Sequence, residues 1–264
     1  MSKPNPYYSN EKEREELNRM SLSFAFNEIE EHPKTVILIA GKEGSGKTHL
    51  ACTMSEKGPV YLIDTEYRAQ IVTRKFKNVK FATVKNYKEL VVAVKHILTT
   101  QPPGTIVIDS ISDLQTFAEI EYLDRTKKEA VYPIFNWGDV YALCNAIIDD
   151  IKFSGKFNLV LTARVKEEYI GDKPTGKMLP RVYLSVPYKS DIVLQFSNDS
   201  KSLSLNKNGY TGNLDVPIKK GQSLPSILDV VNNCVILPQE IAPPTNIISS
   251  QQPVRKVTTL RKVV

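Results

Sequence analysis

The residues that follow a short apolar run, Val36–Ala40, have the types and spacing of a phosphate-binding P-loop, G-x-x-x-x-G-K-[ST]. Glycines at these positions let successive backbone N–H groups converge on phosphate oxygens, and the following helix points its positive N-terminal end at the same charge. We therefore predict that this segment holds the phosphates of a nucleoside triphosphate, through Gly41, Lys42, Glu43, Gly44, Ser45, Gly46, Lys47, Thr48 and His49.

Two side chains of this loop are expected to do chemistry. Lys47 should reach the β and γ phosphates, and the Thr48 hydroxyl should hold Mg²⁺. The predicted cofactors are therefore ATP and Mg²⁺. A plain glycine-rich turn is the alternative, but the upstream strand and a helix expected from Lys47 to about Glu56 supply the context of a P-loop.

Two further apolar runs, Pro59–Asp64 and Gly104–Asp109, end in acidic residues, as buried parallel strands that reach a binding edge do. We expect Glu66 to be the general base that orients the water attacking the γ phosphate. Asp109 is expected to bind Mg²⁺, directly or through water. The alternatives are solvated acids at a strand end for Asp64 and Glu66, and a helix cap for Asp109.

Strands and helices that alternate along the chain must position these residues. The pattern predicts an α/β fold with a doubly wound, mainly parallel sheet and antiparallel strands at one edge. The expected helices are 87–99 and 139–153, a further buried strand is 157–162, and the expected edge strands are 191–196 and 202–205, followed by a hairpin-like signal at 206–209.

The chain is expected to form one globular core with polar ends. Residues 1–32 read as a charged helical segment with a short apolar anchor at 24–26, residues 33–237 as the core, and residues 238–264 as a flexible basic tail. The formal net charge of +6 favours an anionic partner such as nucleic acid, although a solvated basic surface has the same total.

The remaining composition excludes several classes of protein. Hydrophobic residues make up 41% and charged residues 24%, which is ordinary for a soluble globular protein. Cys52, Cys144 and Cys234 lack the spacing of a disulfide framework or a zinc site. Since the sequence also lacks a long apolar stretch and a secretory leader, we expect a cytoplasmic protein without a membrane partner.

Together the P-loop and the two acidic strand ends resemble the ATPase core of RecA and RadA. The chain is more similar still to compact recombinase-like ATPases encoded by phages and archaeal viruses, whose Trp-Gly segment and Thr-Ala-x-x-Lys-like strand end are matched by 137–138 and 162–166. The resemblance covers about residues 33–212. It implies binding of single-stranded DNA, assembly as filaments or rings, and a role in annealing, recombination or replication beside a single-strand-binding or replication protein.

The same resemblance implies roles for residues on the far side of the nucleotide. Thr162 and Arg164 fall where the family has its γ-phosphate sensor, so Arg164 either senses phosphate charge or pairs with Glu167. Lys207 lies in a segment that resembles a hairpin of hexameric helicases and would reach a neighbouring subunit's ATP. Its alternative is a solvated charge at a hairpin tip.

The best candidate for contact with DNA is the loop expected at 171–181, because glycine and proline keep it mobile and its cations can meet phosphates. These cations are Lys173, Lys177 and Arg181, and an ordinary solvated loop is the alternative. Tyr132, Phe135 and Trp137 either stack on bases or close the core.

The sequence therefore predicts an enzyme, a DNA-dependent ATPase that is slow if its trans-acting cation is a lysine. The alternative from another class is a nucleotide switch, or an assembly or loading factor, that recruits replication proteins without remodelling DNA. A small-molecule kinase is a third hypothesis, for which the sequence shows no acceptor-binding signature.

Overall fold

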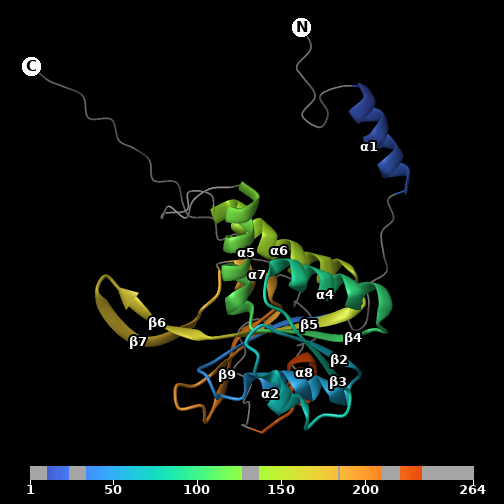
Figure 1. Ribbon diagram of the computed structural model, residues 1–264. Coiled ribbons are helices and arrows are strands. Elements are labelled where there is room, and N and C mark those ends of the chain that lie inside the picture. The colour runs from blue at the N-terminus through green and yellow to red at the C-terminus, as the bar shows by residue number, and fades with distance from the viewer. Residues whose placement is uncertain (1–10, 24–33, 127–136, 184, 210–220, 234–264) are drawn as a thin grey trace, which may run out of the picture.

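The computed structural model of the protein describes residues 11–23, 34–126, 137–183, 185–209 and 221–233 (Figure 1). The predictions for the apolar anchor 24–26, for Tyr132 and Phe135, for Cys234 and for the tail 238–264 lie outside these residues. The expected N-terminal helix is present as α1 (Glu11–Ser23).

A seven-stranded sheet forms the centre of the fold, with strand order β3-β2-β4-β5-β1-β8-β9. The first six of these strands pair in parallel, and β9 pairs antiparallel with β8 at one edge. The predicted α/β fold with a mainly parallel sheet is therefore confirmed, with the antiparallel pair at the predicted edge. The strands are β1 (Val36–Ala40), β2 (Val60–Asp64), β3 (Val79–Thr83), β4 (Gly104–Asp109), β5 (Phe157–Ala163), β8 (Ile192–Phe196) and β9 (Leu203–Asn208).

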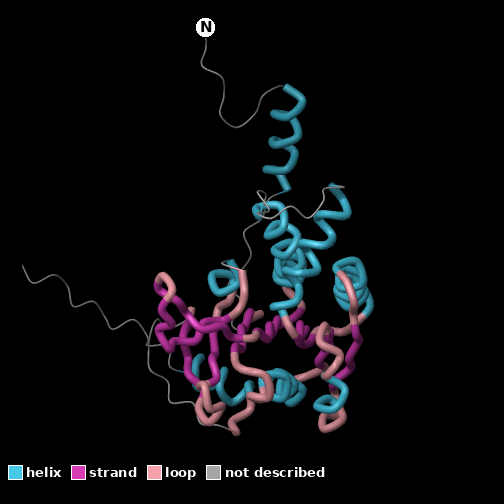
Figure 2. The backbone as a smooth tube through the Cα atoms, turned by 60° about the vertical axis from the view of Figure 1, so that its left-hand side comes forward, coloured by secondary structure: helices cyan, strands magenta, loops and turns pink. Residues whose placement is uncertain are grey.

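Helices cover both faces of this sheet (Figures 1 and 2). Helices α4, α5 and α6 pack on one face, and α2 and α8 lie on the other. The helices are α2 (Lys47–Cys52), continued by the 3₁₀ turn Thr53–Glu56, α3 (Ala69–Thr73), α4 (Tyr87–Thr100), α5 (Ile111–Thr126), α6 (Trp137–Phe153), α7 (Ser185–Lys189) and α8 (Leu224–Asn233). In the part of the chain that the structure describes, none of the helices has the length and apolar character of a membrane span.

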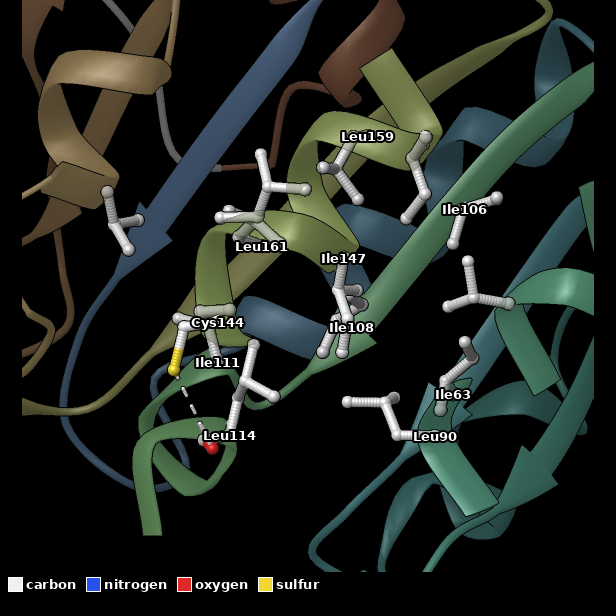
Figure 3. Close-up of a cluster of buried hydrophobic side chains, with 14 of the residues drawn as sticks. Ile63, Leu90, Ile106, Ile108, Ile111, Leu114, Cys144, Ile147, Leu159 and Leu161 are labelled. Carbon is white, nitrogen blue, oxygen red and sulfur yellow. Dashed lines mark hydrogen bonds between the residues drawn. The ribbon is translucent and has the colours of Figure 1, made fainter. Parts of the chain in front are cut away.

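The apolar runs become strands because both of their faces are buried. In β1, Leu38 joins the cluster under α4, α5 and α6, whereas Ile37 and Ile39 join the cluster under α2 and α8. This alternation is the two-residue period of a strand, and a strand covered on both sides must be apolar at every position. Figure 3 shows the first cluster, in which Leu90 of α4 meets the sheet beside Ile63.

Residues 165–180 correct one prediction. The segment 171–181, expected as a mobile loop, contains a turn and strand β7 (Lys173–Pro180), which pairs antiparallel with β6 (Val165–Ile170) in a separate ribbon that projects from the body (Figure 1). Only Gly171 and Asp172 connect the strands, and Gly171 has a φ of 62°, which favours glycine. Glycine and proline correctly predicted the turn at 171–172 but not the strands on either side of it. These strands are largely exposed and of mixed polarity, so their sequence lacks the apolar pattern that predicts a strand.

The hairpin between β8 and β9 corrects a second prediction. The turn lies at 197–202, where the Ser197 N–H donates to the Ser202 carbonyl over 3.0 Å. Lys207 lies near the C-terminal end of strand β9, which follows that turn, so its placement at a hairpin tip is wrong. Its ammonium donates instead to the carbonyls of Pro187, Tyr188 and Ser190 at 2.9, 3.2 and 2.5 Å.

We predict that Leu90→Ala lowers the free energy of unfolding by about 2–5 kcal/mol, because Leu90 is fully buried between α4 and the sheet and its loss leaves a cavity. Val92→Ala on the same helix is the control, since Val92 is 66% exposed and its truncation should change stability by less than about 0.5 kcal/mol. Urea unfolding followed by circular dichroism measures both. Equal effects of the two variants would contradict this description of the core.

Candidate functional site

Strands β1, β2, β4 and β5 run in parallel, so their carboxyl ends meet at one edge of the sheet. The P-loop leaves β1 at this edge and enters α2. A cleft of about 350 Å³ opens here, and most of the predicted nucleotide-site residues line it. The lining residues are Glu43, Gly44, Gly46, Lys47, Thr48, His49, Glu66, Arg68, Val72, Asp109 and Arg164.

The loop has the backbone that phosphate binding needs. Gly44 and Gly46 have φ values of 74° and 103°, which side chains other than glycine rarely adopt. A Cβ on Gly41 would lie 2.5 Å from Ser45 Oγ and 3.0 Å from Phe196 Cβ, so Gly41 lets the loop close on the sheet. Ser45 Oγ is buried and has no hydrogen-bond partner among the described residues, as expected for a loop built around an anion.

Lys47 folds back over the loop. Its ammonium donates to the carbonyl oxygens of Gly41 at 3.0 Å and Lys42 at 2.9 Å. Burial lowers the pKa of Lys47, and the nearby carboxylates of Asp109 and Glu66 oppose that shift. A buried ammonium held only by carbonyls gains a full charge partner when phosphate enters, which suits the predicted role of Lys47.

Asp109 joins three elements at the bottom of the cleft. Its Oδ2 accepts a hydrogen bond from Thr48 Oγ1 of α2 over 2.7 Å, and its Oδ1 accepts a short one from Thr162 Oγ1 of β5. Burial raises the pKa of Asp109, while the hydrogen bonds from Thr162 and Thr48 oppose the rise. The predicted sensor position, Thr162, therefore orients the Asp109 carboxylate.

The pair Thr48 and Asp109 fits a magnesium ion. A hydroxyl and a carboxylate at hydrogen-bond distance are the hard oxygen ligands that Mg²⁺ binds, with phosphate oxygens and water completing its shell. Bound there, the ion would neutralise the phosphate charge that develops as the terminal phosphoryl group leaves. The donor set thus agrees with the predicted cofactors, ATP and Mg²⁺.

Asp64, the last residue of β2, and Glu66, which follows it, have different roles. Asp64 is buried, and its carboxylate accepts hydrogen bonds from the backbone N–H groups of Glu66 and Ala69, both over 2.9 Å. It therefore shapes the loop after β2. Glu66 points into the cleft, where the predicted general base should lie.

Arg164 pairs with Glu66. Both Arg164 Nε and one terminal nitrogen lie 3.0 Å from Glu66 Oε1, and that nitrogen lies 3.4 Å from Asp113. Of the two predicted roles for Arg164, the pair with Glu167 is replaced by ion pairs with Glu66 and Asp113, and phosphate sensing stays a prediction. The cleft therefore contains a cation, Arg164, that is paired with the candidate general base Glu66.

The predicted DNA-binding cations lie apart from the cleft. Lys173 and Lys177 are exposed on β7, and Arg181 follows its last residue. Lys177 has a 3.9 Å ion pair with Glu168 across the ribbon. Trp137 is half-buried and stacks on Tyr141, with ring centroids 5.8 Å apart, so it closes the core side of α6.

The sequence did not predict that Arg68, the N-cap of α3, and Val72 within it line the cleft. It also did not predict the contacts of Ser112 and Asp113 in the first turn of α5. The helical spacing of Ile111, Leu114 and Ala118 was a sufficient signal for α5. Arg68 had no such signal, because its contact with the P-loop joins residues that are distant in sequence.

We predict that Asp109→Asn removes most of the effect of Mg²⁺ on nucleotide affinity, because an amide keeps the shape of the carboxylate but not its charge. The ratio of ATPγS affinities with Mg²⁺ and with EDTA should fall about tenfold. Calorimetric titration measures this ratio, and Asp139→Asn, at an exposed position of α6, is the control. A ratio equal to that of the wild type would remove Asp109 from the metal site.

Comparison with solved structures finds proteins with a similar backbone structure at low sequence identity. A crystal structure of the RadB recombinase is 14% identical with a TM-score of 0.44, and the match covers 70% of this chain and 84% of that one. A prototypical ATPase from the type III secretion system of pathogenic bacteria is 12% identical with a TM-score of 0.46, covering 63% of this chain and 53% of that one. No curated protein matches the sequence.

Comparison with protein-family models gives a direct assignment. A model described as an AAA domain, AAA_24, matches residues 33–236, which include the P-loop, Glu66, Asp109 and Arg164. The mainly parallel sheet with an antiparallel edge pair is that of the predicted RecA-like P-loop NTPase fold. The chain belongs to this AAA domain family of P-loop ATPases.

Proposed function

We propose that this protein hydrolyses ATP in a reaction that single-stranded DNA stimulates, and that it acts in DNA annealing, recombination or replication. The observation that supports this most directly is the pair between Glu66 and Arg164, because Arg164 connects the cleft to the ribbon β6–β7. Its sequence motifs add a resemblance to recombinase-like ATPases of phages and archaeal viruses.

The contents of the cleft support hydrolysis. Lys47 and the P-loop backbone hold the phosphates, and Thr48 and Asp109 hold Mg²⁺. Glu66 also lines the cleft and accepts the proton of the attacking water. Small-molecule kinase chemistry would need an acceptor site as well, so transfer to water is the simpler outcome.

The Arg164 guanidinium restrains this reaction. Arg164 Nε donates a hydrogen bond to Glu66 Oε1, and a terminal nitrogen of Arg164 forms an ion pair with the same oxygen, so the guanidinium occupies the oxygen that would receive a proton. Phosphate charge in the cleft competes for the same guanidinium. Release of Arg164 would therefore free Glu66 Oε1 to accept the proton of water, and hydrolysis stays slow while the pair persists.

A shift of Arg164 would be transmitted to the ribbon β6–β7 through Arg164 and Arg181, the residues that flank it on either side. Ser112 Oγ accepts a hydrogen bond from the Arg164 N–H over 3.0 Å and donates to the Arg181 carbonyl over 2.9 Å. The Arg181 N–H in turn donates to the Arg164 carbonyl over 2.7 Å. These contacts join both ends of the ribbon to α5, beside the Asp113 that also holds Arg164.

The free end of the ribbon has features suited to single-stranded DNA. Tyr169 is 59% exposed and pairs in register with Pro174, while the neighbouring pair joins Ile170 to Lys173. An exposed aromatic ring beside cations is the combination on which bases stack while phosphates are neutralised. Tyr169 was not among the predicted residues.

Self-association as a filament or ring is part of this proposal, as are cytoplasmic action and a single-strand-binding or replication protein as partner. The family resemblance of the motifs supports them. A role for Lys207 in a neighbour's site would require its ammonium to leave three carbonyl acceptors of its own subunit.

ATP turnover with and without single-stranded DNA, together with filter binding over a salt series, tests the function. We expect stimulated turnover and affinity that falls as salt rises. Turnover that ignores DNA, with no binding at low salt, would instead favour a nucleotide switch or loading factor, for which the restrained Glu66 is the supporting observation.

We predict that Glu66→Gln retains ATPγS binding but lowers turnover by about 10²-fold or more, because an amide cannot accept the proton of water. Glu167→Gln is the matched control, since Glu167 is also acidic and near Arg164 in sequence but lies on the ribbon. Steady-state phosphate release without DNA measures both. Normal turnover by Glu66→Gln would assign the base to another group.

We predict that replacing Lys173 and Lys177 together by Ala weakens DNA binding and lowers the slope of log affinity against log salt by about two, one for each lost phosphate contact. Lys95 and Lys152, both exposed on helices, form a control pair with the same loss of charge. If both pairs behave alike, the effect comes from net charge and the ribbon is not the binding surface.

A further inference from the structure

Arg68 and Glu43 face each other across the mouth of the nucleotide cleft. Glu43 belongs to the P-loop and Arg68 to the loop after β2, and the two side chains form an ion pair. Both residues line the cleft, yet the side chain of Glu43 is 76% exposed and that of Arg68 is 69% exposed. An ion pair this exposed is weak, so a better partner for Arg68 displaces Glu43 at little cost.

The fold presents Arg68 to the cleft in a defined way. Asp64 binds the N–H groups of Glu66 and Ala69, which closes the intervening backbone into a tight loop. Within it, Tyr67 has a φ of 63°, a left-handed conformation that residues other than glycine adopt rarely and that is often kept at functional sites. Glu66 and Arg68, on either side of Tyr67, both line the cleft.

The other two cations of the cleft are engaged more firmly. Lys47 is buried and donates to two backbone carbonyls, and Arg164 is shared by Glu66 and Asp113, each 22% exposed. Among the described residues that line the cleft, Arg68 is therefore the cation that an incoming anion recruits with least rearrangement.

The position of Arg68 selects the terminal phosphate. Only Tyr67 separates it from Glu66, the proposed base for attack on the γ phosphate, and its partner Glu43 belongs to the P-loop itself. We propose that Arg68 leaves Glu43 to bind the γ phosphate, so that this pair discriminates nucleoside triphosphate from diphosphate. The proposal rests on the assignment of the cleft as an ATP site.

Calorimetric titration of the full chain with ATPγS and with ADP, both with Mg²⁺, tests this proposal without measuring hydrolysis. Arg68→Ala should weaken ATPγS binding about tenfold and ADP binding less than about twofold, the loss of one charge-assisted contact to the terminal phosphate. Glu43→Gln should tighten ATPγS binding about twofold or more, because it releases Arg68 and removes a repelling charge. Arg68→Lys should restore part of the ATPγS affinity.

Arg74→Ala is the control, because Arg74 caps the other end of α3, is exposed and does not line the cleft. It removes the same charge from the same helix and should leave both affinities unchanged. Equal losses for ATPγS and ADP in Arg68→Ala, or wild-type affinities, would overturn the proposal. A wild-type chain that binds neither nucleotide would overturn the ATP site itself, which separates the two failures.

Discussion

The Asp109 carboxylate connects the elements on which the cleft depends, because Thr48 of α2 and Thr162 of β5 both donate hydrogen bonds to it at the end of β4. A buried carboxylate is costly without such donors, so the three elements must keep their relative positions. That constraint also sets the P-loop, since Thr48 lies in the first turn of the helix that the loop enters. One polar cluster thus aligns the metal ligands and the phosphate cradle.

A second polar cluster surrounds the first and controls what the cleft can do. Arg164 binds Glu66 and Asp113, while Thr65 Oγ1 donates to Asp113 and accepts the Ser110 N–H. The ends of β2, β4 and β5 are therefore joined by side chains as well as by the sheet. Ser112 extends this cluster to Arg164 and Arg181, which flank the ribbon β6–β7. The same set of hydrogen bonds therefore connects the charged groups of the cleft to the ribbon.

The cleft is nearly balanced in charge before nucleotide arrives. Lys47, Arg68 and Arg164 stand among Glu43, Glu66 and Asp109. Each cation is held by a carbonyl or carboxylate that phosphate oxygens can replace. Phosphate oxygens that recruit Arg68 and Arg164 displace Glu43 and Glu66 from them, and a Mg²⁺ ion held by Asp109 would offset part of the negative charge that the nucleotide adds.

The sequence by itself determined the phosphate loop, the buried strands and the roles open to Lys47, Thr48 and Asp109, because a P-loop and an apolar strand are local patterns whose chemistry depends on neighbours in the chain. It did not determine that Arg164 pairs with Glu66 rather than Glu167, that residues 165–180 form a ribbon, or that Lys207 serves its own subunit. Only the order of strands in the sheet decides which distant side chains meet, and that order follows from packing of the whole core.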